Sequence, residues 1–182
     1  RGWSSSASAA SRAPSGPCSN RSDAPYRSYD PWLPDSYLRN QGVHPCGLDD
    51  LLESSRAIFV LAIPLPSNRE LLDRAKLERI QPGSVLVLIS RAHLVDFDAL
   101  TELVGAGRFR AAIDVFPKEP VPKDHPIRTA PGTILSGHRA ANVPRALHAI
   151  GKMVVDDLEA LIAGQPPTSM LAAQPETIKR FE

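Results

Sequence analysis

The stretch Ala57-Ile58-Phe59-Val60-Leu61-Ala62-Ile63-Pro64 decides the fold, because it is a continuous apolar run of strand length. A run of this length without polar alternation is typical of a β-strand that is buried on both faces of a sheet. Three later segments, at residues 84–89, 109–116 and 133–135, fit the same interpretation. The sequence therefore predicts four buried strands rather than the half-exposed strands of an antiparallel sheet.

Helical patterns separate these strands. A short helix is expected at residues 48–52, and Ser67 is a candidate N-cap for a helix that continues to Ile80. Further helices are expected at residues 96–104 and 143–163, the last of them long and amphipathic. Strands and helices that alternate at this spacing indicate an α/β fold, in which helices cover a parallel sheet.

The composition excludes several classes of protein. The chain has 182 residues, of which 42% are hydrophobic and 23% charged, as in ordinary globular domains. A formal net charge of +1 provides no electrostatic attraction to nucleic acid or to an acidic membrane surface. No apolar run approaches the roughly 18 residues of a membrane span. Cys18 and Cys46 make neither a disulfide framework nor a metal site. We therefore expect a cytoplasmic protein without a metal, a membrane or a nucleic-acid partner.

The first 28 residues differ in composition from the rest of the chain. They contain nine serines, five alanines and four arginines, and the first aliphatic side chain larger than alanine is Leu33. Such a segment cannot bury enough apolar surface to offset the entropy lost on ordering, so we predict that residues 1–28 are disordered. The segment lacks the apolar region of a signal peptide. A transit peptide and a linker or tail are the alternative interpretations.

Polar residues follow three of the predicted strands. Ser90-Arg91 follows the second strand, Asp114 to Glu119 the third, and Gly137-His138 the fourth. Open α/β sheets bind their ligands beyond the carboxyl ends of the strands. An arginine can bind a carboxylate through two parallel hydrogen bonds. A histidine exchanges protons near neutral pH, and a neighbouring carboxylate fixes its tautomer. These three strand ends are therefore the candidate active site.

Each of these residues also has a structural interpretation. An arginine after a strand is most often a solvated loop charge, Glu119 fits a turn before a proline, and a single histidine is more often hydrogen-bonded for structural reasons. Asp114 is harder to explain in this way, because a carboxylate inside an apolar run needs a partner. The remaining histidines are expected to be structural: His44, His93, His125 and His148.

Several of these segments together resemble one enzyme family. They are Ser90-Arg91, Leu94-Val95-Asp96, Ala99-Leu100 and Leu135-Ser136-Gly137-His138, and above all residues 111–120, which read Ala-Ala-Ile-Asp-Val-Phe-Pro-Lys-Glu-Pro. Their order and spacing resemble the nucleotide-binding domain of the D-isomer-specific 2-hydroxyacid dehydrogenases. The resemblance implies a Rossmann-like doubly wound parallel sheet that is incomplete at its N-terminus. It also implies NAD as the cofactor, a small 2-oxoacid or 2-hydroxyacid as the substrate, and a homodimer.

The resemblance also implies roles for individual residues. Arg91 would bind the substrate carboxylate and polarise its carbonyl group, His138 would be the general acid and base, and Glu119 would hold it. Asp114 would contact the nicotinamide side of NAD. Asp30 would bind the adenosine ribose and repel a 2′-phosphate, although Arg27 and Arg39 are cations nearby. The resemblance places the cofactor against these residues: Asp30, Pro64, Ser90, Arg91, Asp114, His138 and Ala140.

The sequence departs from the family pattern at several positions. Ala92-His93 follow the arginine where the family usually has glycine, Gly137 replaces a proline, and Arg139 replaces an apolar residue. A larger departure concerns the glycine-rich fingerprint, which binds pyrophosphate at a helix N-terminus. This fingerprint should lie just upstream of Asp30, and it is absent there.

An out-of-frame reading of the first residues restores that fingerprint. If most codons end in G or C, and each new codon joins a third base to the next two, residues 3–6 read LVVV and residues 7–12 read GFGSLA. The remainder then reads approximately RALRPLLEPFGCTV. In order, these are a buried strand, a G-x-G-x-x-G/A turn and a helix that leads into the next strand. We therefore hypothesise that residues 1–28 are a frameshifted translation of the fingerprint, and we expect weak or no NAD binding.

The sequence thus predicts three segments and leaves two functions open. Residues 1–28 are a disordered or out-of-frame segment, residues 29–165 a partial NAD-binding domain, and residues 166–182 a C-terminal tail. The first function is that of an NAD-dependent oxidoreductase that acts on the CH–OH group of a D-2-hydroxyacid. We expect this form of the enzyme to be inactive if the fingerprint is lost. The alternative is a non-catalytic Rossmann-like module for nucleotide sensing or dimerisation.

Overall fold

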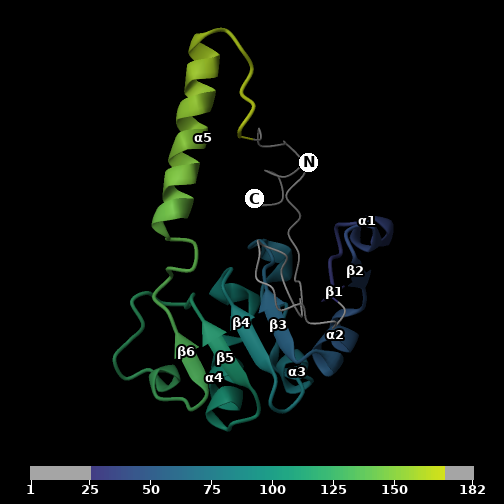
Figure 1. Cartoon of the computed structure of the whole chain (residues 1–182). Coiled ribbons are helices and arrows are strands. Elements are labelled where there is room, and N and C mark those ends of the chain that lie inside the picture. Colours follow the sequence, from purple (N-terminus) through teal and green to yellow (C-terminus); the bar gives the residue numbers. More distant parts are fainter. Residues whose placement is uncertain (1–25, 171–182) are drawn as a thin grey trace, which may run out of the picture. The chain divides into compact units, whose positions relative to one another are not determined.

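Four parallel strands form the larger of two sheets in the computed structural model, which describes residues 26–170. In sheet order they are β3 (Ala57–Val60), β4 (Val85–Leu88), β5 (Arg110–Ile113) and β6 (Thr133–Leu135) (Figure 1). The last residues of neighbouring strands are partners in the register, so all four strands end at one edge of the sheet. The predicted parallel α/β sheet is confirmed.

A second, smaller sheet contains β1 (Tyr26–Ser28) and β2 (Val43–Pro45), which are also parallel and are connected by α1 (Asp35–Asn40). The sequence does not predict these elements. For residues 26–28 the prediction of a disordered segment is wrong, because their backbone pairs with β2 and Cys46 N–H donates to Ser28 O at 3.0 Å. This short strand is stabilised by backbone hydrogen bonds rather than by aliphatic side chains. The rest of the predicted out-of-frame segment lies outside the described residues.

Most of the predicted helices are confirmed. Helices α2 (Leu48–Ser54), α4 (Phe97–Gly105) and α5 (Pro144–Ile162) lie where the sequence places them. Asp96 caps α4 by accepting the N–H of Ala99 at 2.9 Å. Short 3-10 turns lie at Pro66–Asn68, Ala92–Leu94 and Pro126–Arg128. No helix of residues 26–170 is long and apolar enough to cross a membrane.

The helix predicted from Ser67 to Ile80 is wrong in its start and its cap. Leu72 is extended instead, since its N–H donates to Leu94 O at 2.9 Å and its carbonyl accepts the N–H of Asp96 at 3.0 Å. Only after this bridge does α3 (Arg74–Glu78) begin. Asp73 caps it by accepting the N–H of Lys76 at 2.9 Å. Pairing with a distant segment has therefore overridden the local helical pattern.

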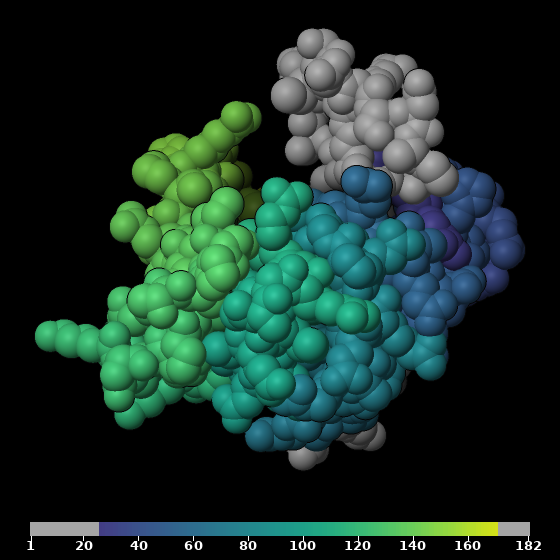
Figure 2. Space-filling view, turned by 90° about the horizontal axis from the view of Figure 1, so that it is seen from below, coloured from purple at the N-terminus to yellow at the C-terminus, as the bar shows by residue number. Residues whose placement is uncertain are grey.

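The two faces of the larger sheet are not equally buried. Helices α2, α3 and α4 contribute Leu51, Leu77 and Leu100 to a core with the fully buried side chains of one face, which are Ile58, Val60, Leu86, Leu88, Ala111 and Ile113. The opposite face carries Ala57, Phe59, Val85, Val87 and Ala112, which are only half-buried. The sequence predicts burial on both faces, and only one is completely covered. Viewed from below, residues of the β4–α4 region (teal) form a continuous surface (Figure 2).

The chain divides into two compact units, with the boundary between Gly137 and His138. This boundary lies inside the range 29–165, for which the sequence predicts one domain, so that domain division stays a prediction. In the second unit, Asp157 is only 5% exposed. It accepts the backbone N–H groups of Thr168, Ser169 and Met170 at 2.7–2.8 Å. These bonds, that of Ser169 first, hold the pKa of the Asp157 carboxyl below its usual value.

Candidate functional site

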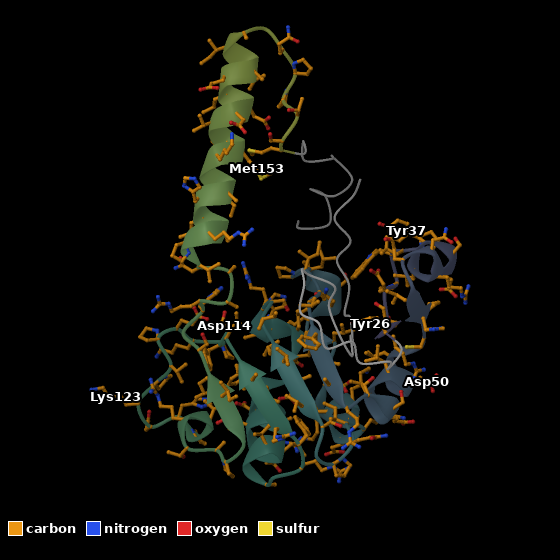
Figure 3. The ribbon with its side chains drawn as sticks, in the orientation of Figure 1. Tyr26, Tyr37, Asp50, Asp114, Lys123 and Met153 are labelled. Atoms are coloured by element: carbon orange, nitrogen blue, oxygen red, sulfur yellow. The ribbon has the colours of Figure 1, made fainter. Side chains whose placement is uncertain are left out.

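Three strands of the larger sheet deliver polar residues to the same edge. Leu88, Ile113 and Leu135 are partners in the register, so the residues after them emerge side by side. Ser90-Arg91 follows β4 and Asp114 follows β5 directly. Figure 3 shows Asp114 at the end of β5, whereas Lys123 points outward from the loop that follows. Within the first unit, the ends of β4 and β5 thus bring Ser90-Arg91 and Asp114 to the same edge, whereas His138 belongs to the second unit.

Ser90 and Arg91 have different environments. The Oγ atom of Ser90 is buried, and among residues 26–170 it has no hydrogen-bond partner. Arg91 is exposed, and its Nη1 donates to the carbonyl of Ser90 at 2.8 Å. Its guanidinium therefore lies beside its own strand end, with its other N–H groups available to an anion at the edge of the sheet.

His93 lies close to two guanidinium groups. Burial lowers the pKa of His93, and the charges of Arg69 and Arg91 lower it further. The N–H of Glu70 donates to His93 O at 2.8 Å, which brings the segment of Arg69 next to that of Arg91. The sequence predicts only a structural role for His93. Its cationic surroundings depend on the hydrogen bond between Glu70 and His93, and no sequence pattern indicates that these two segments are neighbours.

Asp114 and Glu119 occupy the two ends of one short loop. Asp114 is 3% exposed, and its N–H donates to Leu88 O at 2.9 Å. Glu119 is exposed, and its Oε1 accepts the N–H of Phe116 at 3.0 Å. This bond holds the carboxylate over the loop.

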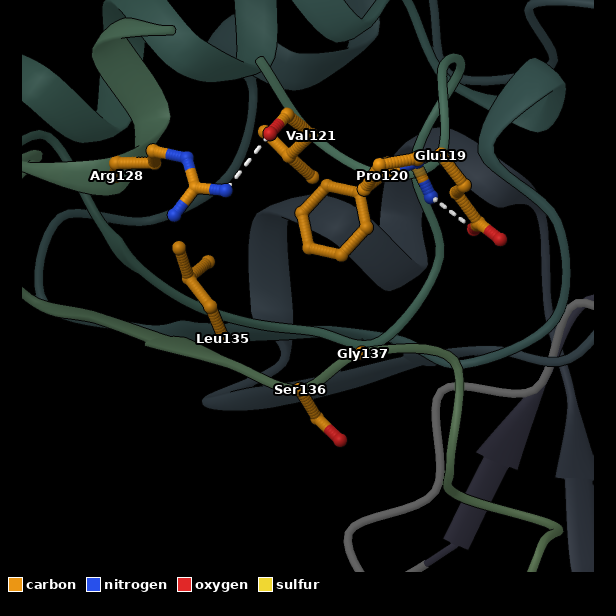
Figure 4. Close-up of a pocket in the computed structure, with 8 residues that line it drawn as sticks. Glu119, Pro120, Val121, Arg128, Leu135, Ser136 and Gly137 are labelled. Carbon is orange, nitrogen blue, oxygen red and sulfur yellow. Dashed lines mark hydrogen bonds between the residues drawn. The ribbon is translucent and has the colours of Figure 1, made fainter. Parts of the chain in front are cut away.

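A pocket of about 320 Å³ lies between this loop and β6 (Figure 4). Arg128 forms one side, where its Nη2 donates to Val121 O at 2.7 Å and its Nε donates to Pro122 O at 2.8 Å. The sequence does not predict Arg128, because it follows no strand and belongs to no motif. The lining residues are Phe116, Glu119, Pro120, Val121, Arg128, Leu135, Ser136 and Gly137.

His138 and Ala140 belong to the second unit and are exposed in it. The backbone of His138 has a φ of 54°, a conformation that is uncommon for a residue with a side chain. This left-handed backbone conformation changes the direction of the chain at His138, which is the first residue of the second unit. The predicted roles of His138 and Ala140 stay predictions.

A second cluster of predicted residues lies at the carboxyl ends of β1 and β3. The Oδ1 of Asp30 accepts the N–H groups of Trp32 and Leu33 at 2.9 and 3.2 Å. Its Oδ2 is buried and, within residues 26–170, has no hydrogen-bond partner. The chain neighbours of Asp30, Tyr29 and Pro31, line a cavity of about 110 Å³. The residues that line this cavity are Tyr29, Pro31, Trp32, Ala62, Ser67, Asn68 and Leu71.

The first unit thus contains two groups of candidate residues. Ser90, Arg91, Asp114 and Glu119 gather at the ends of β4 and β5. Asp30 lies by the small cavity, and the half-buried Pro64 is in the loop after β3. Among residues 26–170 no three His, Cys, Asp or Glu side chains are placed to hold a metal ion. The arrangement provides two acids and one cation at a sheet edge, and the guanidinium of Arg91 is the group there that can bind an organic anion.

A family model matches most of the described chain. The model for the D-isomer specific 2-hydroxyacid dehydrogenase, NAD binding domain, matches residues 20–140. This range includes both sheets and all candidate residues up to Ala140.

Individual relatives show the same similarity. The chain is 33% identical over 141 residues to D-3-phosphoglycerate dehydrogenase of Methanocaldococcus jannaschii, which covers 75% of this chain and 26% of that protein. It is 36% identical over 121 residues to glyoxylate/hydroxypyruvate reductase B of Pectobacterium atrosepticum, covering 66% and 38%. The crystal structure of a phosphoglycerate oxidoreductase from Rhizobium etli superimposes with a TM-score of 0.72 at 41% identity, covering 83% and 46%. The chain therefore spans less than half of the length of each.

Proposed function

Because this chain belongs to the D-isomer specific 2-hydroxyacid dehydrogenase family, we propose that it is the cofactor-binding part of an NAD-dependent oxidoreductase. Its substrate would be a small 2-oxoacid, reduced to the D-2-hydroxyacid, or the reverse. The observation that carries the proposal is the meeting of Ser90, Arg91, Asp114 and Glu119 at one sheet edge. A binding module without catalysis has no need for an arginine and two acids at this place.

The residues by the small cavity fit the adenosine end of NAD. The Asp30 Oδ2 is a buried acceptor without a partner among residues 26–170, which is costly unless a ligand hydroxyl donates to it. A ribose diol provides such donors, and the cavity that the neighbouring Tyr29 and Pro31 help to form is lined mostly by apolar and aromatic side chains. In this proposal Pro64, Ser90, Asp114 and Ala140 bind the rest of the cofactor. When bound, NAD supplies the hydride acceptor or donor.

The charges around Asp30 favour NAD over NADP. A 2′-phosphate needs a cation near the ribose, and Arg27 and Arg39 are the candidates. Arg27 is instead bonded to Ser54 and to Asp50, at 3.4 Å between Nη2 and Oδ2. Arg39 pairs with Asp35 at 3.0 Å on α1. Both guanidinium groups are therefore engaged with other carboxylates or hydroxyls, and the Asp30 carboxylate repels a phosphate.

In this proposal the residues at the edge of the larger sheet have separate roles in substrate binding, proton transfer and positioning. Arg91 binds the substrate carboxylate and polarises the neighbouring carbonyl through its unused N–H groups. His138 donates a proton to the carbonyl oxygen during reduction and removes it during oxidation. Glu119, held by the N–H of Phe116, positions the imidazole and fixes its tautomer. Buried Asp114 lies next to the proposed nicotinamide site.

Titration of the full chain with NADH and NADPH, followed by nucleotide fluorescence, tests the cofactor. We expect weak NADH binding and weaker NADPH binding, since the glycine-rich fingerprint is not among residues 26–170. Equal binding of the two nucleotides would contradict the role of Asp30, and a low-micromolar dissociation constant for NADH would contradict the expected weakness.

Turnover of glyoxylate and hydroxypyruvate with NADH separates the enzyme from the second candidate, a non-catalytic nucleotide-sensing or dimerisation module. The missing fingerprint favours that module, and the conjunction of Arg91 with two acids favours the enzyme. Turnover by a form that includes the fingerprint supports the enzyme, and nucleotide binding without reduction of any 2-oxoacid supports the module. A homodimer and a cytoplasmic location stay predictions, which sedimentation and cell fractionation would test.

A further inference from the structure

The loop that follows β3 and the loop that follows β4 lie side by side. The N–H of Glu70 donates to His93 O at 2.8 Å, and a parallel bridge joins Leu72 to Val95. Glu70 has a φ of 51°, a conformation that is uncommon for a residue with a side chain. These contacts hold the segment that contains Arg69 against the segment that contains His93.

The two loops carry three basic side chains, which are Arg69, Arg91 and His93. Both guanidinium groups are exposed, and the imidazole is half-buried. Burial lowers the pKa of His93, and the charges of Arg69 and Arg91 lower it further, so both charges act on the ring. Among residues 26–170 no carboxylate raises this pKa, not even that of Glu70, the chain neighbour of Arg69. His93 is therefore neutral at pH 7 and provides a ring N–H beside two positive charges.

No carboxylate of the described chain neutralises this group of cations. Other arginines of the first unit form ion pairs, namely Arg27, Arg39, Arg74 and Arg79. Among residues 26–170 neither Arg69 nor Arg91 has such a partner. Neighbouring guanidinium groups repel each other, and an anion that lies between them removes this cost. Arg91 donates from Nη1 to Ser90 O, which leaves its other N–H groups for a ligand.

We propose that Arg69 and His93 form a subsite, next to Arg91, for a second anionic group of the substrate. The preferred substrate is then a dicarboxylic 2-oxoacid or D-2-hydroxyacid. Arg91 binds the carboxylate beside the reacting carbon, and Arg69 binds the distant carboxylate through paired N–H groups. The ring N–H of His93 donates to the same distant carboxylate. The subsite rests on the proposed function, because it assumes that Arg91 binds the first carboxylate.

The charge of this group favours a second carboxylate over a phosphate. With His93 neutral, Arg69 and Arg91 provide two positive charges, which two carboxylates balance. A carboxylate and a phosphate together carry a charge of about −2.5 to −3 at pH 7, which would leave negative charge without a partner. The planar guanidinium also matches the two oxygens of a carboxylate.

D-Malate and D-lactate test the subsite on the full chain, because D-malate is D-lactate with a second carboxylate on the methyl carbon. The readout is the NMR signal of the His93 imidazole near pH 6.5, at constant ionic strength and without cofactor or turnover. A carboxylate beside His93 raises its pKa, so the signal moves toward that of the protonated ring. We expect D-malate to bind at least about tenfold more tightly than D-lactate. The exposed His44 on β2 is the internal control and should not respond. Equal binding of the two acids, or an unchanged His93 signal, overturns the proposal.

Two arginine variants test which cation binds the second carboxylate. Arg69→Gln removes the charge and the paired donors, so we expect D-malate binding to weaken by about tenfold and D-lactate binding to stay unchanged. Arg56→Gln is the matched control, because Arg56 is also exposed and without an ion pair among residues 26–170, and it precedes β3 at the opposite edge of the sheet. Circular dichroism verifies that both variants are folded. Equal effects of the two variants overturn the proposal, and the comparison of the two acids on the unmodified chain decides the matter if Arg69→Gln is unfolded.

Further outcomes separate the subsite from the proposed function. Inorganic phosphate that shifts the His93 signal at the same concentrations as D-malate overturns the subsite, since any anion would then bind there. Tight D-malate binding that depends on Arg69, without turnover of any 2-oxoacid by a form that includes the fingerprint, supports the subsite and contradicts the proposed function. Turnover of glyoxylate without any preference for dicarboxylic acids supports the proposed function and overturns the subsite alone.

Discussion

The two sheets of the first unit share a direction and differ in how they are stabilised. In β3–β6, Leu86, Leu88 and Ile113 are buried in a continuous core. In β1–β2 only Ser28 is buried, and the strands depend on backbone pairing. Each sheet nevertheless presents a polar residue just after a strand end. The larger sheet thus carries the groups proposed for chemistry, and the smaller sheet carries Asp30, the acid proposed for cofactor choice. Substitutions in the first should change rate and stability, and those in the second should change affinity.

The largest expected effect is that of Arg91→Lys on turnover. Lysine keeps the charge and loses the paired N–H groups, so the substrate carbonyl is no longer polarised in the same geometry. We expect kcat/KM for a 2-oxoacid, measured by NADH oxidation in a form that includes the glycine-rich fingerprint, to fall by about 10²–10³. Arg108→Lys is the control, because the exposed Arg108 side chain donates to Glu78 O, away from the proposed site residues. Full activity of Arg91→Lys would remove the arginine from the proposed chemistry.

The next effect compares the two cores. Leu88→Ala leaves a cavity in the middle of the larger sheet, where Leu88 is 0% exposed, and should lower the free energy of unfolding by about 2–5 kcal/mol. Leu38→Ala removes a buried side chain of α1 that lies outside this core, and should lower the free energy of unfolding by less. Urea unfolding measures both. Equal losses would show that the two sheets form one cooperative core.

Asp30→Asn tests the smaller sheet alone. The amide keeps the size of the side chain and loses the charge that strengthens hydrogen bonds to a ribose, so we expect NADH affinity to fall by about tenfold while unfolding is nearly unchanged. Asp98→Asn, an exposed acid on α4, is the matched control. Fluorescence titration measures the affinity. A variant that binds NADPH more tightly than before would further support Asp30 as the group that excludes the 2′-phosphate.

The smallest effect concerns helix caps. Asp73 caps α3, and the N–H and the ammonium of Lys76 hold the pKa of its carboxyl below the ordinary value of 3.8. Helix α1 begins after Pro34 and has no side-chain cap. Asp73→Ala should lower the free energy of unfolding by about 1 kcal/mol at pH 7, and Asp35→Ala on α1 should lower it by less.

The pH dependence of this cap has a definite sign. A carboxyl with a lowered pKa in the folded state stabilises it above pH 3.8 and loses that contribution as the pH falls through the folded-state value. The difference in the free energy of unfolding between the unmodified chain and Asp73→Ala should therefore narrow below pH 3.8. Urea unfolding at pH 7 and at pH 3 measures it, and a constant difference would contradict the cap.

The larger sheet could be predicted from the sequence because its apolar runs are long enough to identify buried strands. The strands Tyr26–Ser28 and Val43–Pro45 could not, since three residues with mixed polarity have no period. Arg91 and Asp114 could be predicted as neighbours, because parallel strands end at the same edge of a sheet. Arg128 was missed, since only the folded loop brings it to the pocket. Likewise, the extended backbone of Leu72 depends on a partner 22 positions later, Leu94, which no local pattern shows.

The bonds of Asp157 have a consequence for the way the chain leaves the second unit. Helix α5 ends at Ile162, yet the N–H of Met170 is bonded to a carboxylate five residues before that end. The backbone therefore reverses its direction after α5, and Met170 lies beside the helix rather than beyond its C-terminus. A label attached there would report on the C-terminal third of the helix, around Asp157. One carboxylate accepts all three of these backbone hydrogen bonds. Asp157→Ala would remove them, so residues 168–170 and the label would move away from the helix.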